Sequence, residues 1–535
     1  MEKPIMVITY DVGTSGLKTC LLSIGKEVKL LASEIAGYDL FILEGGGAEQ
    51  DPLQLWSAMG STTQKLLSKT ATNPAEIAGI SFCSQMQGLV LVDRQGNPLR
   101  RMMSYMDQRA CDEIDEIMGQ GLKISGINIF KLLKSIRETG AVSASVKDPV
   151  WKYKWVKNNE PELFKKVYKW LDVKEFLICK CTDNFVMTED SAFATLLYSI
   201  REGKKGWSKA VCRMLDVNMD HLPSIIKSTD KAGLLTAEAA LALGLVTGTP
   251  VYGGGGDASL IGVGAGAVSI GDTHIYTGTS GWVSTVVTKS MLDVSSMIAS
   301  IVGAQSGRYN YFAELETAGK CLEWVKDHLA LDEIGVYLDG VLVHESKETI
   351  YASLYDYLSN VIDEVPPGCG GVVFTPWLHG NRCPFEDSTA RGMFFNIGLG
   401  TGKSELIRAV IEGVCFHLRW MLESQEKKIK TSETIRFVGG GALSSVTCQI
   451  LADVLQRKIE TVEEAQNTGA IGAAIVVAIG LSFIGSFEEA KQLVPAKRMF
   501  YPNSEDKAIY DRHFSVFMNL YRNNKKAFAL LNSCR

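Results

Sequence analysis

A turn near the start of the chain combines residue types that can hold a phosphate. Gly13, Thr14 and Ser15 follow an apolar run that ends at Asp11, and Lys18 lies just beyond them. Glycine lets backbone N–H groups turn towards an anion, hydroxyls add donors, and a carboxylate can hold Mg²⁺. The pattern predicts a phosphate and metal site, and a hairpin turn that binds nothing is the alternative.

The same four-residue turn occurs a second time. Gly278, Thr279, Ser280 and Gly281 repeat it between two β-rich runs, about half of the 535-residue chain after the first copy. Two similar halves, each with a phosphate-type turn, predict duplicated domains that face one ligand across a cleft. A chance match of four residues is the alternative.

Asp257 is the acid best placed for chemistry. It follows a predicted buried strand and the glycine run 253–256, where a small-residue helix begins. The structural interpretation is a helix N-cap. The functional interpretation is that the glycines leave room for a ligand and that the helix N-terminus keeps the carboxylate ionised. Such a weak base suffices for phosphoryl transfer.

A second glycine run, Gly439–Ala442, follows the apolar strand predicted at 435–438. A flat ring or a ribose could lie on its backbone, and a strand-to-helix turn is an equally good interpretation. The run 398–404 looks like a P-loop, but Ile397 stands where that motif needs glycine. The seven histidines have no HxxxH spacing, which argues against a histidine metal site.

Composition excludes several classes of function. Apolar content of 46% and charge of 21% describe a folded protein, and 535 residues predict two large domains. The net charge of −5 gives no basic footprint for nucleic acid or an anionic membrane. Twelve cysteines without a CxxC pair and no secretory segment at the start predict a cytoplasmic protein. The uncharged stretch 465–487 is predicted to be a buried helix rather than a membrane span.

Strand and helix patterns alternate in both halves, which predicts an α/β architecture. Asp51 and Pro52 predict the start of a helix that buries Trp56. We expect two strands around a polar bend at 84–88, helical structure from 148 to 181, and a helix at 234–246. In the second half we expect a strand at 249–253 and helices at 404–426 and 444–456. The domain boundary is predicted near residue 249.

Together these pieces resemble the FGGY family of carbohydrate kinases over nearly the whole chain. The two turns are similar to the family's phosphate loops, and Gly439–Ala442 to its adenosine motif. Residues 148–159 resemble its first signature, 374–395 the loop into its second, and 48–52 a stretch typical of the xylulokinase branch. In the first signature Pro149, Lys152, Trp155 and Asn158 match.

The resemblance implies two actin/hexokinase-type, ribonuclease H-like domains that flank a central cleft. Residues 1–249 would bind the sugar, the first phosphate loop and Mg²⁺, and residues 250–535 would bind ATP and carry the catalytic acid. The implied reaction is Mg·ATP-dependent phosphorylation of a small ketose or polyol, with a D-xylulose-like pentulose as the best candidate. No nucleic acid or membrane partner is implied, and a homodimer is compatible with the family.

Site residues carry over from the resemblance by position. Asp257 would be the catalytic base and Asp11 the metal ligand. The implied nucleotide-binding residues are Gly13, Thr14, Ser15, Lys18, Gly278, Thr279, Gly319, Glu323, Gly440, Gly441, Ala442 and Ser445. The implied substrate-binding residues are Gln85, Met86, Gln87, Asp107, Lys147 and Asp257.

The sequence departs from the xylulokinase pattern on the sugar side. Gln87 replaces a histidine, Ala258 replaces the asparagine after the predicted base, and Lys147 stands where the signature prefers an aromatic or small residue. D-xylulose is therefore not fixed as the substrate, and an acidic sugar bound by Lys147 is a second hypothesis. The alternatives from other classes are a degenerate sugar-sensing protein and an actin-like ATP-binding protein, both without sugar kinase activity.

Overall fold

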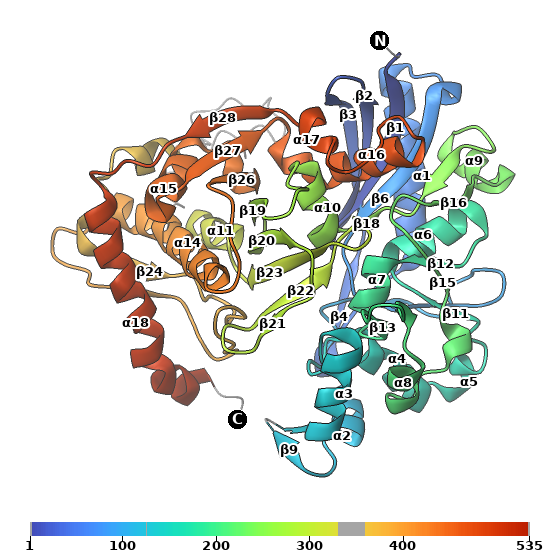
Figure 1. Ribbon diagram of the computed structural model, residues 1–535, viewed down its shortest axis with the longest axis horizontal. Helices are drawn as coiled ribbons and strands as arrows, with labels where there is room; N and C mark the ends of the chain where they lie inside the picture. Colours follow the sequence, from blue (N-terminus) through green and yellow to red (C-terminus); the bar gives the residue numbers. More distant parts are fainter. Residues whose placement is uncertain (1–2, 125, 330–358, 533–535) are drawn as a thin grey trace.

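Two large mixed sheets organise the chain, one in each half (Figure 1). The computed structural model describes residues 3–124, 126–329 and 359–532. In Figure 1 the first half, blue to green, lies beside the second half, which runs from yellow-green to red. The last helix, α18 (Lys507–Asn532), lies along the outer side of the second half.

The first sheet has the strand order β16-β17-β6-β1-β2-β3, with β18 paired to β6. Its hairpin strand β1 is antiparallel to β2 and parallel to β6. The strands are β1 (Ile5–Val12), β2 (Gly16–Ile24), β3 (Val28–Gly37), β6 (Ile77–Ser84), β16 (Lys231–Leu234), β17 (Pro250–Tyr252) and β18 (Gly255–Gly256).

The second sheet has the order β21-β22-β23-β20-β19-β26-β27-β28. The strands are β19 (Thr273–Thr277), β20 (Gly281–Val287), β21 (Leu292–Asp293), β22 (Ile298–Val302), β23 (Tyr309–Leu315), β26 (Thr434–Gly439), β27 (Lys458–Val462) and β28 (Ala496–Phe500). Six of them, from β28 to β23, repeat the order and directions of the six from β16 to β3. The predicted duplication is therefore confirmed at the level of the sheets.

Helices cover the sheets (Figure 1). Asp51 caps the first of them by accepting the Leu53 N–H, with Pro52 in the first turn, as the sequence predicts. The helices used below are α1 (Pro52–Thr70), α4 (Pro149–Asn159), α6 (Val173–Thr182), α7 (Glu189–Ala194), α10 (Asp257–Gly264), α11 (Gly319–His328), α14 (Lys403–Glu426), α15 (Ser445–Leu455) and α16 (Thr468–Gly480).

Helices α10 and α16 join the two halves. α16 comes from the second half but packs against β1 and β6 of the first sheet and against α10. A Cβ at Gly264 would lie 1.8 Å from the Thr468 carbonyl oxygen, and one at Gly472 would lie 2.3 Å from that of Leu260. Only glycine permits this close crossing. α16 is buried along almost its whole length, as predicted, and none of the helices in the described ranges is both long and apolar enough to span a bilayer.

Some local predictions are wrong. The helical region from 148 to 181 is interrupted by β11 (Lys169–Leu171), which pairs with β7 (Val90–Val92) because Trp170 and Leu171 are fully buried there. The helix at 234–246 begins only at Ala237. Trp56 is half-buried rather than buried.

The predicted division after residue 249 separates strands that pair with one another. β17 and β18 follow residue 249 in the sequence, yet both pair with β6 in the first sheet. The apolar run 250–252 predicts a buried strand but not the sheet to which it belongs. We therefore propose a division between Gly264 and Thr273, where the chain passes from α10 to β19.

Candidate active site

The first predicted phosphate turn connects β1 to β2. Its carbonyl groups accept hydrogen bonds from Tyr38 and Gln50. The Tyr38 hydroxyl donates to the carbonyl oxygens of Gly13 and Gly16. Gln50 Nε2 donates to the Thr14 oxygen at 2.6 Å, and the Tyr38 N–H donates to that of Ser15 at 3.2 Å. With its carbonyls engaged, the turn is suited to offer N–H groups to an anion. Sequence reasoning missed Tyr38 and Gln50, although the stretch 48–52 pointed to the latter.

Asp11 and Lys18 face each other across the hairpin. They are direct partners in the β1–β2 register. Burial raises the pKa of the Asp11 carboxyl above its usual range, and the Lys18 ammonium opposes that rise. Lys18 Nζ also donates to Asn467 Oδ1 at 2.9 Å, so the two halves meet at this lysine.

The second turn connects β19 to β20, and within the described ranges only backbone groups bind its carbonyls. The Gly319 N–H donates to the Gly278 oxygen at 2.8 Å, and the Ala318 N–H donates to that of Thr279 at 3.1 Å. The start of α11 thus fixes this turn. A Cβ at Gly319 would lie 2.3 Å from the Gly278 oxygen, so glycine is required there.

The run Gly439–Ala442 passes directly over the end of β19. Gly439 has φ +91°, and a Cβ there would lie 2.4 Å from the Thr277 oxygen. A Cβ at Gly441 would lie 2.1 Å from Thr277 Oγ1, which is buried and has no hydrogen-bond partner among the described residues. An orphaned hydroxyl beside a bare backbone is suited to a ligand such as a nucleotide.

Asp257 is the first residue of α10, and the N-cap is Gly256. The N-cap interpretation of Asp257 is therefore wrong, and its Oδ1 accepts the adjacent Ala258 N–H at 2.7 Å. The prediction that the glycines leave room for a ligand is also wrong. A Cβ at Gly254 would lie 2.2 Å from the Phe82 oxygen, and one at Gly256 would lie 2.0 Å from Met86 Sδ. Protein atoms fill that space.

The electrostatics of Asp257 differ from the prediction. Burial raises the pKa of its carboxyl to about 7, the Ala258 N–H opposes this, and the carboxylates of Asp11, Glu314 and Asp190 raise it further. Desolvation outweighs the helix N-terminus, so the expected weak, fully ionised base is not what the structure contains. A carboxylate with a pKa near neutrality is a stronger base.

The predicted substrate residues after β6 lie beside Asp257. Met86 packs against Gly256, and Gln85 Nε2 donates to Gln50 Oε1 at 3.0 Å, which links it to the first turn. Gln87 has φ +65°, and its N–H donates to Asp172 Oδ2 at 2.9 Å. Its carbonyl accepts Lys152 Nζ at 2.9 Å. Hydrogen bonds to Asp172 and from Lys152 thus fix the backbone of this bend.

The other two predicted substrate residues have different surroundings. Asp107 is fully buried and accepts hydrogen bonds from Arg109 and from the Ala48 N–H. Lys147 is half-buried, just before α4, and its charge helps lower the pKa of buried Lys152, which burial lowers to about 8. Lys147 makes no ion pair with the part of the chain that the structure describes.

Arg382, from the second half, lies close enough to Asp148 of the first half for its charge to affect the Asp148 carboxyl. Its Nη1 donates to Glu314 Oε2 at 2.6 Å. Burial raises the pKa of the Asp148 carboxyl to about 6, and the charges of Lys152 and Arg382 oppose that rise. Lys152, Glu314 and Arg382 were not among the predicted site residues. Lys152 lies in the first signature and Arg382 in the loop 374–395, whereas Glu314 lies in neither.

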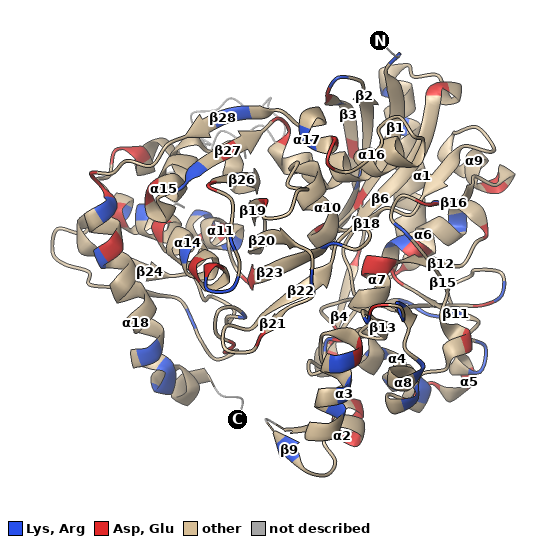
Figure 2. Cartoon of the chain, in the orientation of Figure 1, with Lys and Arg blue, Asp and Glu red and all other residues tan. Residues whose placement is uncertain are grey.

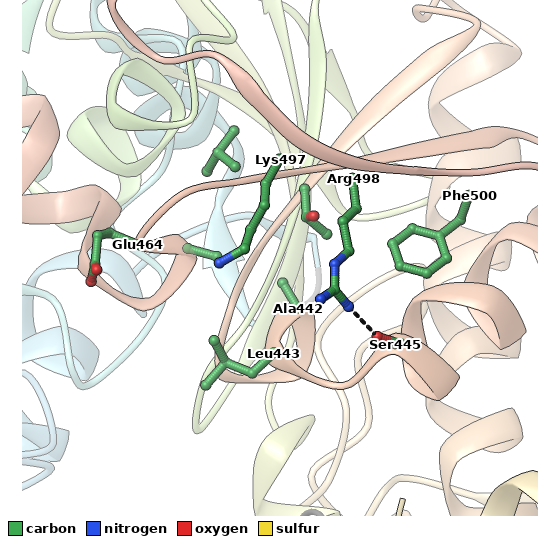
Figure 3. A pocket seen from close by; sticks show the side chains of 10 residues that line it. Ala442, Leu443, Ser445, Glu464, Lys497, Arg498 and Phe500 are labelled. Carbon is green, nitrogen blue, oxygen red and sulfur yellow. Dashed lines mark hydrogen bonds between the residues drawn. The ribbon is translucent and has the colours of Figure 1, made fainter. Parts of the chain in front are cut away.

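Ser445 and Ala442 line a pocket between η5 (Gly440–Leu443), β27 and β28 (Figure 3). Arg498 Nη1 donates to Ser445 Oγ at 2.8 Å, and Lys497 Nζ donates to Glu463 Oε2, also at 2.8 Å. The pocket has a volume of about 110 Å³, well below the roughly 300–1,000 Å³ of a complete ligand site. It can be only one edge of a nucleotide site. Glu323 on α11 is exposed.

The acidic groups fit a magnesium ion bound together with phosphates. Burial raises the carboxyl pKa values of both Asp11 and Asp257, and the negative charge of Asp11 raises that of Asp257 further. Among the described residues no group of three or more His, Cys, Asp or Glu could hold a metal alone. Mg²⁺ is commonly held by one or two carboxylates and by substrate phosphates. Elsewhere, acidic and basic residues are interspersed over both halves (Figure 2).

Comparisons with known proteins agree with this geometry. Residues 6–264 match the N-terminal domain of the FGGY family of carbohydrate kinases, and residues 274–481 match its C-terminal domain. A xylulose kinase of Bacillus subtilis is 28% identical over 99% of both chains. A gluconokinase of the same species is 25% identical over 96% of this chain and 95% of its own.

Solved structures show the same fold. A ligand-bound xylulose kinase from Lactobacillus acidophilus superposes with a TM-score of 0.83 at 24% identity, covering 98% of this chain and 99% of its own. A gluconate kinase from that organism gives the same score and identity over 99% and 100%. Both halves have the predicted actin/hexokinase-type fold. The chain is a phosphotransferase that acts on a sugar, and it belongs to the FGGY family of carbohydrate kinases.

Proposed function

We propose that this chain transfers the γ-phosphoryl group of ATP to a hydroxyl of a small ketose or polyol, with a D-xylulose-like pentulose as the first candidate. The observation that carries the proposal is the carboxylate of Asp257, whose pKa of about 7 reflects burial and the nearby charge of Asp11. A base with a pKa near the working pH is suited to accept a proton from an attacking hydroxyl.

The predicted catalytic, metal-binding and nucleotide-binding residues each have a role in this proposal. Asp257 accepts the proton of the sugar hydroxyl, while Lys18 and the N–H groups of the two turns offset charge on the phosphates. Asp11 would hold Mg²⁺, which supplies further positive charge when bound. Gly319, Glu323, Gly440–Ala442 and Ser445 would surround the adenosine. Closure of the halves would exclude water and so limit wasteful ATP hydrolysis.

ADP release from Mg·ATP tests the proposal, measured against pentuloses, hexuloses, pentitols, glycerol and sugar acids. We expect one compound to stimulate release, and Asp257→Asn to lower kcat by about 10³-fold or more while ATP still binds. Asp183→Asn is the matched control, because Asp183 is exposed and has the left-handed φ of +58° that asparagine tolerates. Wild-type turnover in folded Asp257→Asn would contradict the base role. ATP binding without stimulation by any compound would favour the sensing or actin-like protein.

A sugar acid is a second candidate substrate. Its support is Lys147, a half-buried lysine close to Lys152 with no ion pair among the described residues, and the relatives named gluconokinase. A carboxylate on the substrate would give this lysine a partner. Lys147→Ala should then raise KM for gluconate about tenfold and leave KM for neutral sugars unchanged. Exposed Lys204→Ala is the control, and an equal effect of Lys147→Ala on both substrate classes would remove this candidate.

We also propose a cytoplasmic protein without nucleic acid or membrane partners. Of the eleven cysteines in the described ranges, all are free and ten are buried, which suits a reducing compartment. The interspersed charges of Figure 2 are in keeping with a small-molecule substrate as the partner.

A further inference from the structure

A fully buried carboxylate lies directly behind the predicted base. Asp190 Oδ2 accepts the Gly256 N–H at 2.8 Å and the Ser259 hydroxyl, although these residues are 66 and 69 positions away. Gly256 precedes Asp257 and Ser259 follows it in the first turn of α10. Asp190 therefore holds this turn on both sides of the base.

The other oxygen of Asp190 is equally well held. Its Oδ1 accepts the Ser191 N–H at 2.9 Å and the Thr188 hydroxyl. Lys174 Nζ donates to the hydroxyls of Thr188 and Ser191, each at 2.6 Å. These hydrogen bonds and the Lys174 charge outweigh burial and hold the pKa of Asp190 below its usual range. The cluster keeps a negative charge in the interior.

The sequence at the start of α10 provides no capping side chain, so a carboxylate from another element can stabilise this helix end. The first N–H groups of a helix have no partner within the helix, and the N-cap side chain usually binds one of them. In α10 the N-cap is glycine, which has no side chain. Gly255 allows the carboxylate to approach, because a Cβ there would lie 2.9 Å from Asp190 Oδ2. Asp190 therefore stabilises the helix start from outside, and Asp257 does not have to serve as the cap.

We propose that Asp190 is a positioning residue for phosphoryl transfer, which fixes the first turn of α10 so that the Asp257 carboxylate meets the substrate hydroxyl. The inference rests on the proposed base role of Asp257. Small displacements of a reacting group cost large factors in rate, whereas nucleotide and sugar binding use other residues. Loss of Asp190 should therefore lower kcat and leave KM nearly unchanged.

Steady-state kinetics of Asp190→Asn and Ser259→Ala test the inference, with Asp257→Asn in the same assay. We expect Asp190→Asn to lower kcat at least tenfold, and Ser259→Ala about threefold, with KM for ATP and sugar within about twofold of wild type. Glu412→Gln is the matched control, because Glu412 is also buried, accepts the Gly368 N–H and pairs with Arg408, but far along the chain in α14. It should melt earlier and keep its kcat.

The outcomes distinguish the positioning role of Asp190 from the base role of Asp257. Wild-type kcat in folded Asp190→Asn, or an equal loss in Glu412→Gln, would overturn the positioning role alone. If Asp190→Asn does not fold, Ser259→Ala decides, and its wild-type kcat would overturn the role. Wild-type turnover in Asp257→Asn would instead refute the proposed base and the inference with it.

Discussion

The two halves of the molecule share a sheet topology and a hairpin turn, but they hold the turn differently. In the first half the side chains of Tyr38 and Gln50 bind its carbonyls. In the second half the backbone at the start of α11 does so. The flanking positions differ as well. At the same distance along the chain from the turn, Tyr276 in β19 replaces Asp11 and Val283 in β20 replaces Lys18, and Tyr276 pairs with Trp282 instead.

This difference indicates a division of labour within a duplicated frame. A GTSG turn joins two antiparallel strands in both halves, but charged side chains flank it only in the first. The second half instead adds bare backbone at Gly439–Gly441. In our proposal the first half thus supplies charge near the reacting phosphate, and the second half supplies a flat surface for the nucleoside. Four changes test this comparison.

The largest effect is expected where the flanking charges differ. Asp11→Asn should lower kcat by about 10²–10³-fold, because it removes a carboxylate proposed to bind the metal. The equivalent change in the other half, Tyr276→Phe, should change kcat less than about threefold. Mg²⁺ titrations of both variants are the measurement. Equal losses in the two halves would contradict the division.

The glycine run of the second half should be sensitive at one position. Gly441→Ala would place a Cβ 2.1 Å from Thr277 Oγ1, whereas at Gly440 the nearest atom is 3.9 Å away. We expect Gly441→Ala to raise KM for ATP about tenfold, and Gly440→Ala less than about twofold, because only the former displaces the surface under the nucleotide. The same KM for both variants would show that this backbone does not contact ATP.

The side-chain ties of the first turn should matter less. Gln50→Leu removes the hydrogen bond to the Thr14 oxygen as well as the one accepted from Gln85. It should raise KM for ATP about fivefold, because the tie to the turn is worth about one net hydrogen bond. Gln54→Leu, which loses two exposed hydrogen bonds, both to Asp39, is the control. Unchanged kinetics in Gln50→Leu would show that the turn keeps its shape without this tie.

The smallest effect concerns stability and pH. The carboxyl of Asp257 has a pKa of about 7 in the folded chain, against roughly 3.9 unfolded, so the folded state binds more protons between about pH 4 and 7. Stability contributed by this group therefore falls as the pH rises through that window. Asp257→Asn should gain on the order of 2 kcal/mol over wild type at pH 8 and nothing at pH 4, a figure reduced because the Asp257 side chain is half-buried rather than fully buried. Urea unfolding checks this, with Asp183→Asn expected to show no trend.

Much of the frame could be predicted from the sequence, because its signals are local. The two GTSG turns, the cap at Asp51 and the helix at 404–426 each depend on a few neighbouring residues. The position of Asp257 at a helix start is local in the same way.

What could not be predicted depends on residues that are distant in the sequence. The glycines at 254–256 look like space for a ligand, but Phe82, Asp190 and Met86 occupy that space. The pKa of Asp257 depends on its burial and on acids from other elements, so a helix N-terminus alone gave the wrong answer. The membership of β17 in the first sheet likewise requires knowledge of its pairing with β6.

The most direct test of the central claim is the rate of phosphoryl transfer in a single turnover, measured from pH 5 to 9 for wild type and Asp257→Asn. If Asp257 accepts the proton, the wild-type rate should fall about tenfold per pH unit below pH 7, because protonation removes the base. The variant should be slow and independent of pH across this range. A variant that keeps the wild-type rate or its acid limb would contradict the account.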